Sequence, residues 1–142
     1  MTREQRGAII VTVAPIVLIG FLINHAMGVT WDLPRALGFA FAIVFLVLLT
    51  IARIQLGTNF SVTPQARALV TTGLYSRIRN PVYVFSTPAI AGFLVYLHYF
   101  RGALLFLAVI IPIQWLRARA EARVLEAKFG DQYRNYRAKT WF

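Results

Sequence analysis

The strongest constraint in this 142-residue sequence is the absence of charged side chains over four long stretches. Residues 8–27 and 81–100 contain no Asp, Glu, Lys or Arg, and neither do residues 36–52 or 103–116. A helix needs about 20 apolar residues to cross the hydrocarbon core of a bilayer. We therefore expect an all-α integral membrane protein with about four transmembrane helices, over residues 8–27, 36–54, 81–100 and 103–116.

The composition supports this expectation. Hydrophobic residues make up 58% of the chain and charged residues only 14%, whereas an average soluble domain carries about 25% charged residues. The length allows a single domain, residues 1–142, and a compact fold in water would leave much of this apolar surface exposed. The chain contains no cysteine, which excludes a disulfide scaffold, a thiolate metal site and a cysteine nucleophile.

Two features of the uncharged stretches need interpretation: the length of the first stretch and the junction of the last two. Residues 8–27 are too long for the apolar region of a cleaved signal peptide and lack a small-residue cleavage site, so we interpret them as a membrane helix. Only Arg101 and Gly102 separate the third and fourth stretches, and we predict that they form the tight turn of a helical hairpin.

Basic residues concentrate on one side of the predicted membrane. Alternating the four helices places 13 of the 15 Lys and Arg residues on the side of the two termini. These residues are Arg3, Arg6, Arg53, Arg67, Arg77, Arg79 and all basic residues from Arg117 to Lys139, which leaves Arg35 and Arg101 on the other side. The positive-inside rule then predicts that both termini are cytoplasmic. Attraction to anionic lipid accounts for the net charge of +10 without a nucleic-acid partner.

Two segments remain on the cytoplasmic side, the loop 55–80 and the tail 117–142. A 26-residue connection is long for a compact protein, which indicates a function for the loop. In the tail, Glu121, Leu125 and Phe129 recur every four residues and share one face of a predicted helix. A carboxylate on the same face as two apolar side chains indicates a face turned towards protein, and Gly130 is the expected end of this helix.

Most catalytic motifs are missing from the sequence. It contains no GxSxG, no glycine-rich phosphate loop and no HExxH. We expect the two histidines, His25 and His98, to be polar residues at the extracytoplasmic interface, and we expect no metal site.

The junction of the loop with the third stretch has the features of a helix start. Gly73 permits a turn, Pro81 suits the first helical position, and Asn80 is the natural N-cap, whose side chain would accept a bond from an early N–H group. Such N–H groups also suit a ligand carboxylate.

The residues alone also allow structural interpretations of both segments. The loop can be a re-entry segment anchored by Tyr75 and Tyr83, with nearby arginines at the lipid headgroups. The tail can be a basic amphipathic helix that lies on the cytoplasmic leaflet.

Together, the two segments resemble the isoprenylcysteine carboxyl methyltransferase family, which includes small prokaryotic members and is related to the phospholipid methyltransferases. Its pattern is LVTxGxYxxxRHPxY before a membrane helix, then ExxxLxxxFGxxYxxY after the next one. This chain has LVTTGLYSRIRNPVY at 69–83 and EARVLEAKFGDQYRNY at 121–136. It departs from the pattern at Asn80, which replaces histidine, at Leu74, which often is proline, and at Ala122, which often is acidic. The resemblance covers residues 55–140.

The resemblance implies a membrane methyltransferase that binds S-adenosyl-L-methionine, releases S-adenosyl-L-homocysteine and acts on a lipophilic acceptor in a prokaryotic inner membrane. The acceptor would be an isoprenylcysteine-like carboxyl or another lipid-borne group. The implied cofactor contacts are Gln65, Arg67, Ala68, Leu69, Val70, Tyr75, Asn80, Pro81, Val82, Tyr83 and Glu121. Arg117, one turn before Glu121, would orient the substrate, and Glu121 would also serve in catalysis.

Two other functions stay open at this point. One is a non-catalytic membrane protein whose basic tail binds anionic lipid or a partner. The other is an NADPH-dependent reductase of the related sterol-reductase type. Those relatives usually carry an acidic residue soon after the proline–tyrosine motif, and residues 84–86 contain none.

Overall fold

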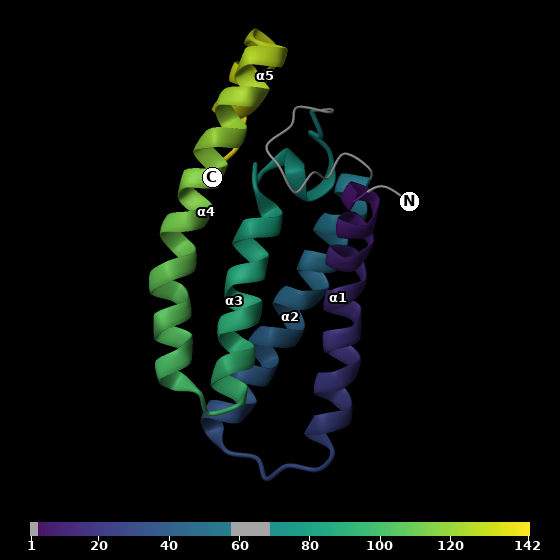
Figure 1. Ribbon diagram of the computed structural model, residues 1–142, viewed down its shortest axis with the longest axis vertical. Helices are drawn as coiled ribbons and strands as arrows, with labels where there is room; N and C mark the ends of the chain where they lie inside the picture. The colour runs from purple at the N-terminus through teal and green to yellow at the C-terminus, as the bar shows by residue number, and fades with distance from the viewer. Residues whose placement is uncertain (1–2, 58–68) are drawn as a thin grey trace.

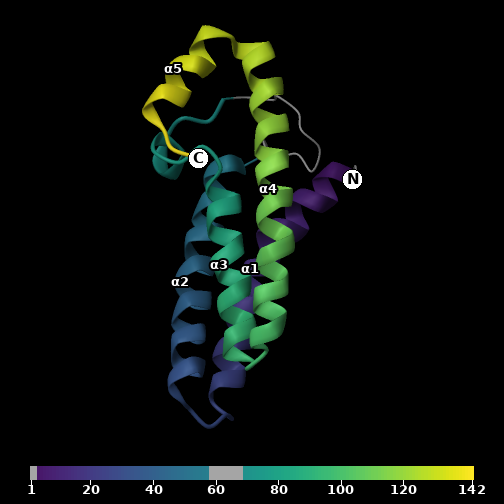
Figure 2. The ribbon, with the colours of Figure 1, turned by 90° about the vertical axis from the view of Figure 1, so that its left-hand side faces the viewer.

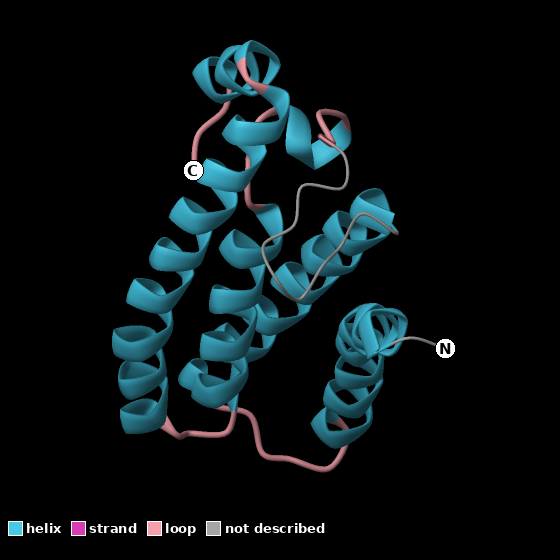
Figure 3. Ribbon diagram, turned by 45° about the horizontal axis from the view of Figure 1, so that its top comes forward, coloured by secondary structure: helices cyan, strands magenta, loops and turns pink. Residues whose placement is uncertain are grey.

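A computed structural model describes residues 3–57 and 69–142 of the chain. Its helices are α1 (Arg3–Ala26), α2 (Leu33–Leu56), the 3-10 helix η2 (Gly73–Ser76), α3 (Pro81–Tyr96), α4 (Phe100–Phe129) and α5 (Asp131–Lys139). The described residues form no strand, and their one bridge joins Ile78 to Trp141. The all-α prediction is confirmed (Figure 3).

The four long helices, α1 to α4, run alternately up and down (Figures 1 and 2). The loops at residues 27–32 and 97–99 lie at one end of the bundle, and the start of α1, η2 and α5 lie towards the other. The C-terminal part of α4 extends beyond its neighbours, and α5 folds back from it (Figure 2). The two segments that carry the family pattern therefore meet at one end of the bundle.

Two helices, α2 and α4, are long and apolar enough to cross a membrane. Only 11% of the most apolar window of α4 is buried inside the protein, so its apolar side chains face outward. The other two bundle helices have shorter apolar parts, Thr12–Ala26 in α1 and Pro81–Tyr96 in α3.

Several predicted helix ends agree with the structure. Helix α3 begins at Pro81, and α4 ends at Phe129, where Gly130 follows with a φ of 50°. This left-handed backbone is the conformation that glycine adopts without steric cost. Asp32 caps α2, since its Oδ1 accepts a hydrogen bond from the backbone N–H of Arg35 at 2.9 Å.

The predicted turn at Arg101 and Gly102 is wrong. Both residues lie in the first turn of α4, and residues 97–99 connect α3 to α4. A Cβ atom on Gly102 would collide with the ring of Tyr99. The glycine therefore makes room for an aromatic ring against the helix and does not serve to reverse the chain.

Both histidines lie at this end of the bundle. His25 Nδ1 is 2.7 Å from the hydroxyl of Tyr96, so the two side chains share a hydrogen bond between α1 and α3. His98 Nε2 is 3.0 Å from Asp32 Oδ2, which connects the two loops at this end.

The closest helix packing joins α2 to α3. A Cβ atom on Gly38 would lie 2.7 Å from the carbonyl oxygen of Gly92 and would also meet the backbone nitrogen of Tyr96. Small residues let helices approach closely where lipid removes the hydrophobic drive for association. The buried side chains of Ala42 and Ala89 belong to the same core. This contact fixes α3, and with it the residues at the start of α3, relative to α2.

We predict that Gly38→Ala destabilises the protein by about 1–3 kcal/mol, the usual cost of overpacking a core. The matched control is Gly20→Ala in α1, where a new Cβ atom would meet nothing within 4 Å. Thermal unfolding in detergent measures both effects. The control should be neutral or slightly stabilising, because alanine favours a helix over glycine by about 0.5–1 kcal/mol. Equal unfolding temperatures for the two variants would contradict the glycine contact.

Candidate active site

Helix η2 is attached to the end of α2 and supports one side of the site. Gly73 starts it with a φ of 60°, and the Gln55 side chain accepts a hydrogen bond from the N–H of Leu74 at 2.8 Å. The Tyr75 side chain is only 5% exposed and packs with Leu49 and Phe85. The buried Tyr75 side chain therefore anchors η2 against α2 and α3.

The Tyr75 hydroxyl is buried and has no hydrogen-bond partner among the described residues. Burial raises the pKa of Tyr75, and both Arg53 and Glu121 lie close enough for their charges to influence it. Arg53 in α2 is itself buried and donates to Thr12 Oγ1 at 3.0 Å. Three side chains from separate segments thus lie near one another: Tyr75 of η2, Arg53 of α2 and Glu121 of α4.

The tail stabilises this arrangement from the other side. The hydroxyl of Tyr136 in α5 donates to the backbone oxygen of Tyr75 at 2.6 Å. A tyrosine hydroxyl is protonated near neutral pH, and burial raises the pKa of Tyr136 further, to about 12, so the hydroxyl remains a donor in alkaline solution as well. This contact holds α5 against η2.

The backbone before α3 is held by the last two residues of the sequence. Trp141 N–H donates to Arg77 O at 3.0 Å, and its carbonyl accepts from Arg79 N–H at 3.1 Å. Asn80 N–H donates to Phe142 O at 3.0 Å. Residues 141–142 therefore pair with the chain that leads into α3.

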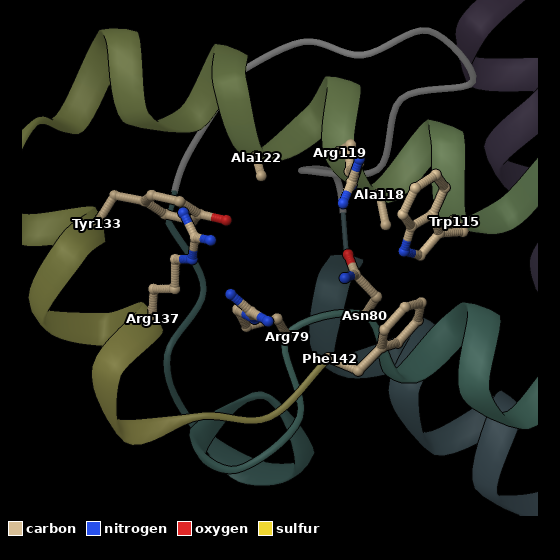
Figure 4. A pocket seen from close by; sticks show the side chains of 9 residues that line it. All are labelled: Arg79, Asn80, Trp115, Ala118, Arg119, Ala122, Tyr133, Arg137 and Phe142. Carbon is tan, nitrogen blue, oxygen red and sulfur yellow. The ribbon is translucent and has the colours of Figure 1, made fainter.

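Asn80 occupies the N-cap position of α3, but its side chain makes no capping hydrogen bond, so that part of the prediction is wrong. An N-cap residue usually has extended backbone, whereas Asn80 has a ψ of 58°. Its amide lies in the space below α4 beside Arg119 and Phe142 (Figure 4).

A row of polar side chains lies between α3 and α4. The Tyr83 hydroxyl donates to Glu121 Oε1. Arg117 Nη2 lies 4.0 Å from the same oxygen, and the Arg117 guanidinium is 5.6 Å from the centre of the Tyr83 ring. The Glu121 carboxylate is therefore held between an aromatic hydroxyl and a cation.

The row continues towards the apolar part of the two helices. Thr87 Oγ1 donates to Gln114 Oε1 at 2.7 Å, and Gln114 Nε2 donates to Ser86 Oγ at 3.3 Å. We call these residues the polar seam: Tyr83, Ser86 and Thr87 of α3 with Gln114, Arg117 and Glu121 of α4. Polar and ionisable groups among membrane helices are costly and mark functional sites.

The other predicted cofactor contacts fall into two groups. The first group is buried or half-buried and consists of Leu69, Val70, Pro81 and Val82. Within it, Val70 and Val82 pack around the cluster that contains Tyr75. Gln65, Arg67 and Ala68 lie outside the described residues. The structure thus brings Tyr83 and Glu121 together near Tyr75, while the side chain of Asn80 faces a different space.

The predicted face of the tail helix agrees with the structure. Glu121, Leu125 and Phe129 are half-buried, whereas Arg119 and Arg123 are exposed. Sequence reasoning missed Gln114, Thr87 and Arg53 as parts of the site. A signal was present for Gln114, since it interrupts an otherwise apolar run, but its partners on α3 depend on how the helices pack.

Comparison with protein families identifies the chain. The family model described as phospholipid methyltransferase matches residues 23–132, which include both segments that form the polar seam. The chain belongs to this family, whose members are methyltransferases, and the resemblance found from the sequence is confirmed. Comparisons with curated proteins and with solved structures gave no match.

Proposed function

We propose that the protein is an integral membrane methyltransferase that uses S-adenosyl-L-methionine to methylate a lipophilic acceptor. The main support for this proposal is the position of the Glu121 carboxylate. It is held by Tyr83 and Arg117 between α3 and α4, inside the region matched by the family. The second segment of the family pattern contributes this carboxylate, and the first contributes its hydroxyl partner.

The chemistry of these side chains fits the cofactor. S-adenosyl-L-methionine carries an ammonium and a sulfonium, both of which favour a carboxylate and the faces of aromatic rings. Glu121 supplies the carboxylate and Tyr83 the ring. The buried Tyr75 hydroxyl, without a partner among the described residues, offers a further hydrogen bond. Apolar side chains at Leu69 and Val70 suit the adenine ring.

Six further residues complete the cofactor contacts that we propose: Gln65, Arg67, Ala68, Asn80, Pro81 and Val82. The Asn80 amide would reach the cofactor only from the other side of the start of α3, since it faces away from the seam. We therefore place the main contacts at Tyr75, Tyr83 and Glu121.

The bound cofactor supplies an electrophilic methyl group on sulfur. The protein would place the acceptor in line with that methyl group and exclude water from the site. Arg117 suits the task of orienting the acceptor, because a guanidinium binds two oxygens of a carboxylate or phosphate at once. A carboxylate acceptor needs no base. An amine acceptor would lose a proton. The Glu121 carboxylate is the group of the seam placed to take it, either directly or through the Tyr83 hydroxyl, which would pass its own proton to Glu121 as it received the new one.

Binding of S-adenosyl-L-homocysteine tests the cofactor assignment. Thermal unfolding of the detergent-solubilised protein should shift upward, since a ligand at about 100 times its Kd adds about 2.7 kcal/mol of stability. Glu121→Gln should weaken binding by about tenfold or more, equivalent to about 1.4 kcal/mol, because it removes the negative charge. Glu126→Gln is the matched control, as Glu126 pairs with Arg134 of α5, outside the seam.

Arg117→Ala separates the two roles in the same assay. It should leave the affinity for S-adenosyl-L-homocysteine nearly unchanged and lower turnover. The absence of any shift with the unmodified protein would favour a non-catalytic membrane protein. Equal losses in Glu121→Gln and Glu126→Gln would remove Glu121 from the cofactor site.

We also propose that α1–α4 all span the inner membrane of a prokaryotic cell, with both termini in the cytoplasm. The alternating helices α1–α4 support this orientation, and so do the 13 basic residues that the sequence assigns to the side of the two termini. The loop at residues 27–32 would then be periplasmic.

Single cysteines in the cysteine-free chain test this orientation. The positions are Met27 in the loop and Asn135 in α5, both exposed. A membrane-impermeant maleimide should label Met27→Cys once the outer membrane is opened, and Asn135→Cys only after the inner membrane is disrupted. The unmodified chain is the control. Labelling of Asn135→Cys before disruption would reverse the orientation.

A further inference from the structure

A cavity of about 160 Å³ lies between α4, α5 and the residues that precede α3. Figure 4 shows the guanidiniums of Arg79, Arg119 and Arg137 around it, together with the Asn80 amide and the rings of Trp115 and Tyr133. The three arginines come from three segments that are distant in the sequence. The fold therefore brings three positive charges to one small space.

This cavity is distinct from the polar seam. Its lining on α4 includes Ala118, Arg119 and Ala122, whereas the seam uses Arg117 and Glu121. Successive residues of an α-helix are rotated by about 100°, so the two sets lie on different faces of α4. Of the described residues that line the cavity, Asn80 alone is also among the proposed cofactor contacts, so the acceptor and cofactor groups of the proposed function do not account for the three arginines.

The charges in the cavity are only partly compensated. None of the described lining residues is Asp or Glu. Among the described residues, the carboxylate that pairs with one of these arginines is that of Glu126, whose Oε2 lies 3.9 Å from Arg137 Nη1. The other oxygen of Glu126, Oε1, lies 3.2 Å from Arg134 Nε. A single carboxylate shared by α5 arginines leaves the cavity positive.

The individual arginines are oriented for a ligand. Arg119 is stacked on Trp115, with its Cζ atom 3.5 Å from the ring centre, which fixes the plane of the guanidinium. Arg79 Nε is buried and has no hydrogen-bond partner among the described residues. The charges of Arg79 and Arg137 also partly offset the rise in the pKa of Tyr133 that burial causes. A buried donor without a partner is costly, and an anion in the cavity would supply that partner.

A phosphate group fits this space better than a carboxylate. Guanidiniums present planar pairs of N–H donors that match phosphate oxygens, and a phosphate monoester offers three oxygens and more than one negative charge to three arginines. Since one water molecule occupies about 30 Å³ in the liquid, the cavity has room for such a group and some water. Trp115 lies at the end of the apolar run of α4, the level of headgroups in a bilayer.

We infer that the cavity is a second ligand site, which binds a phosphate group beside the methyltransferase site. Its ligand is either the phosphomonoester of a lipid headgroup or inorganic phosphate. The site goes beyond the proposed function. It also lies next to the backbone of Arg79 and Asn80, which leads directly into α3 and is held by residues 141–142.

Calorimetric titration of the full chain in phosphate-free nonionic detergent tests this inference. The probes are dihexanoyl phosphatidate, inorganic phosphate and, without any phosphate, dihexanoylglycerol. Arg119→Ala should weaken binding of the phosphate probe by about tenfold, equivalent to about 1.4 kcal/mol. Arg123→Ala is the matched control, because Arg123 is also exposed on α4 but does not line the cavity.

The pattern of binding identifies the source of the phosphate. Similar affinities for phosphatidate and inorganic phosphate indicate a free anion, and binding of phosphatidate alone indicates a lipid. Arg119→Lys, which keeps the charge but loses the planar donor pair, should give an intermediate affinity and covers the case in which Arg119→Ala does not fold.

Four results would overturn the inference. These are no binding of either phosphate probe, equal binding of dihexanoylglycerol, equal weakening in Arg119→Ala and Arg123→Ala, and displacement of the phosphate probe by S-adenosyl-L-homocysteine. The last result would assign the cavity to the cofactor. The first three results are obtained without S-adenosyl-L-homocysteine, so they test the phosphate site whether or not the proposed cofactor binds.

Discussion

The hydrogen bond from Tyr83 to Glu121 joins the two halves of the site. It connects the start of α3, which follows the long loop, to the part of α4 beyond its apolar run. A carboxylate beside apolar helices is costly unless it is paired and hydrogen-bonded, and Glu121 has both a hydroxyl and a guanidinium partner. The arrangement keeps a carboxylate at the end of the bundle that holds η2 and α5, where the proposed function requires a cationic cofactor and a lipid-borne acceptor to reach it.

The rest of the fold keeps this hydrogen bond in place. The glycine contact between α2 and α3 fixes α3, and the pairing of residues 141–142 with the chain before α3 fixes its first residues. Tyr136 holds α5 against the backbone of Tyr75. As a result, one side of α4 takes part in the polar seam, while another side closes the arginine cavity together with α5.

Features set by local sequence could be predicted, and features set by packing could not. The uncharged stretches indicated the helices, and Pro81 and Gly130 marked one helix start and one helix end correctly, because each depends on neighbouring residues alone. The predicted helix 81–100 was too long, since α3 ends at Tyr96 although no charge or proline marks that end. The spacing of Glu121 and Leu125 likewise indicated which face of the tail meets protein. Gly102 was misread as a turn because its role is to accommodate the Tyr99 ring. The Thr87–Gln114 bond and the arginine cavity join distant segments, and no local pattern reveals such pairs.

The transfer of a methyl group to lipid tests the central claim most directly. Purified protein is incubated with membrane lipid extract and S-adenosyl-L-methionine carrying a tritiated methyl group, and the radioactivity of the organic phase is counted. Labelled lipid is expected with the unmodified protein and with Glu126→Gln, and strongly reduced label with Glu121→Gln. Label that never enters the lipid phase, or that is unaffected by Glu121→Gln, would contradict this claim.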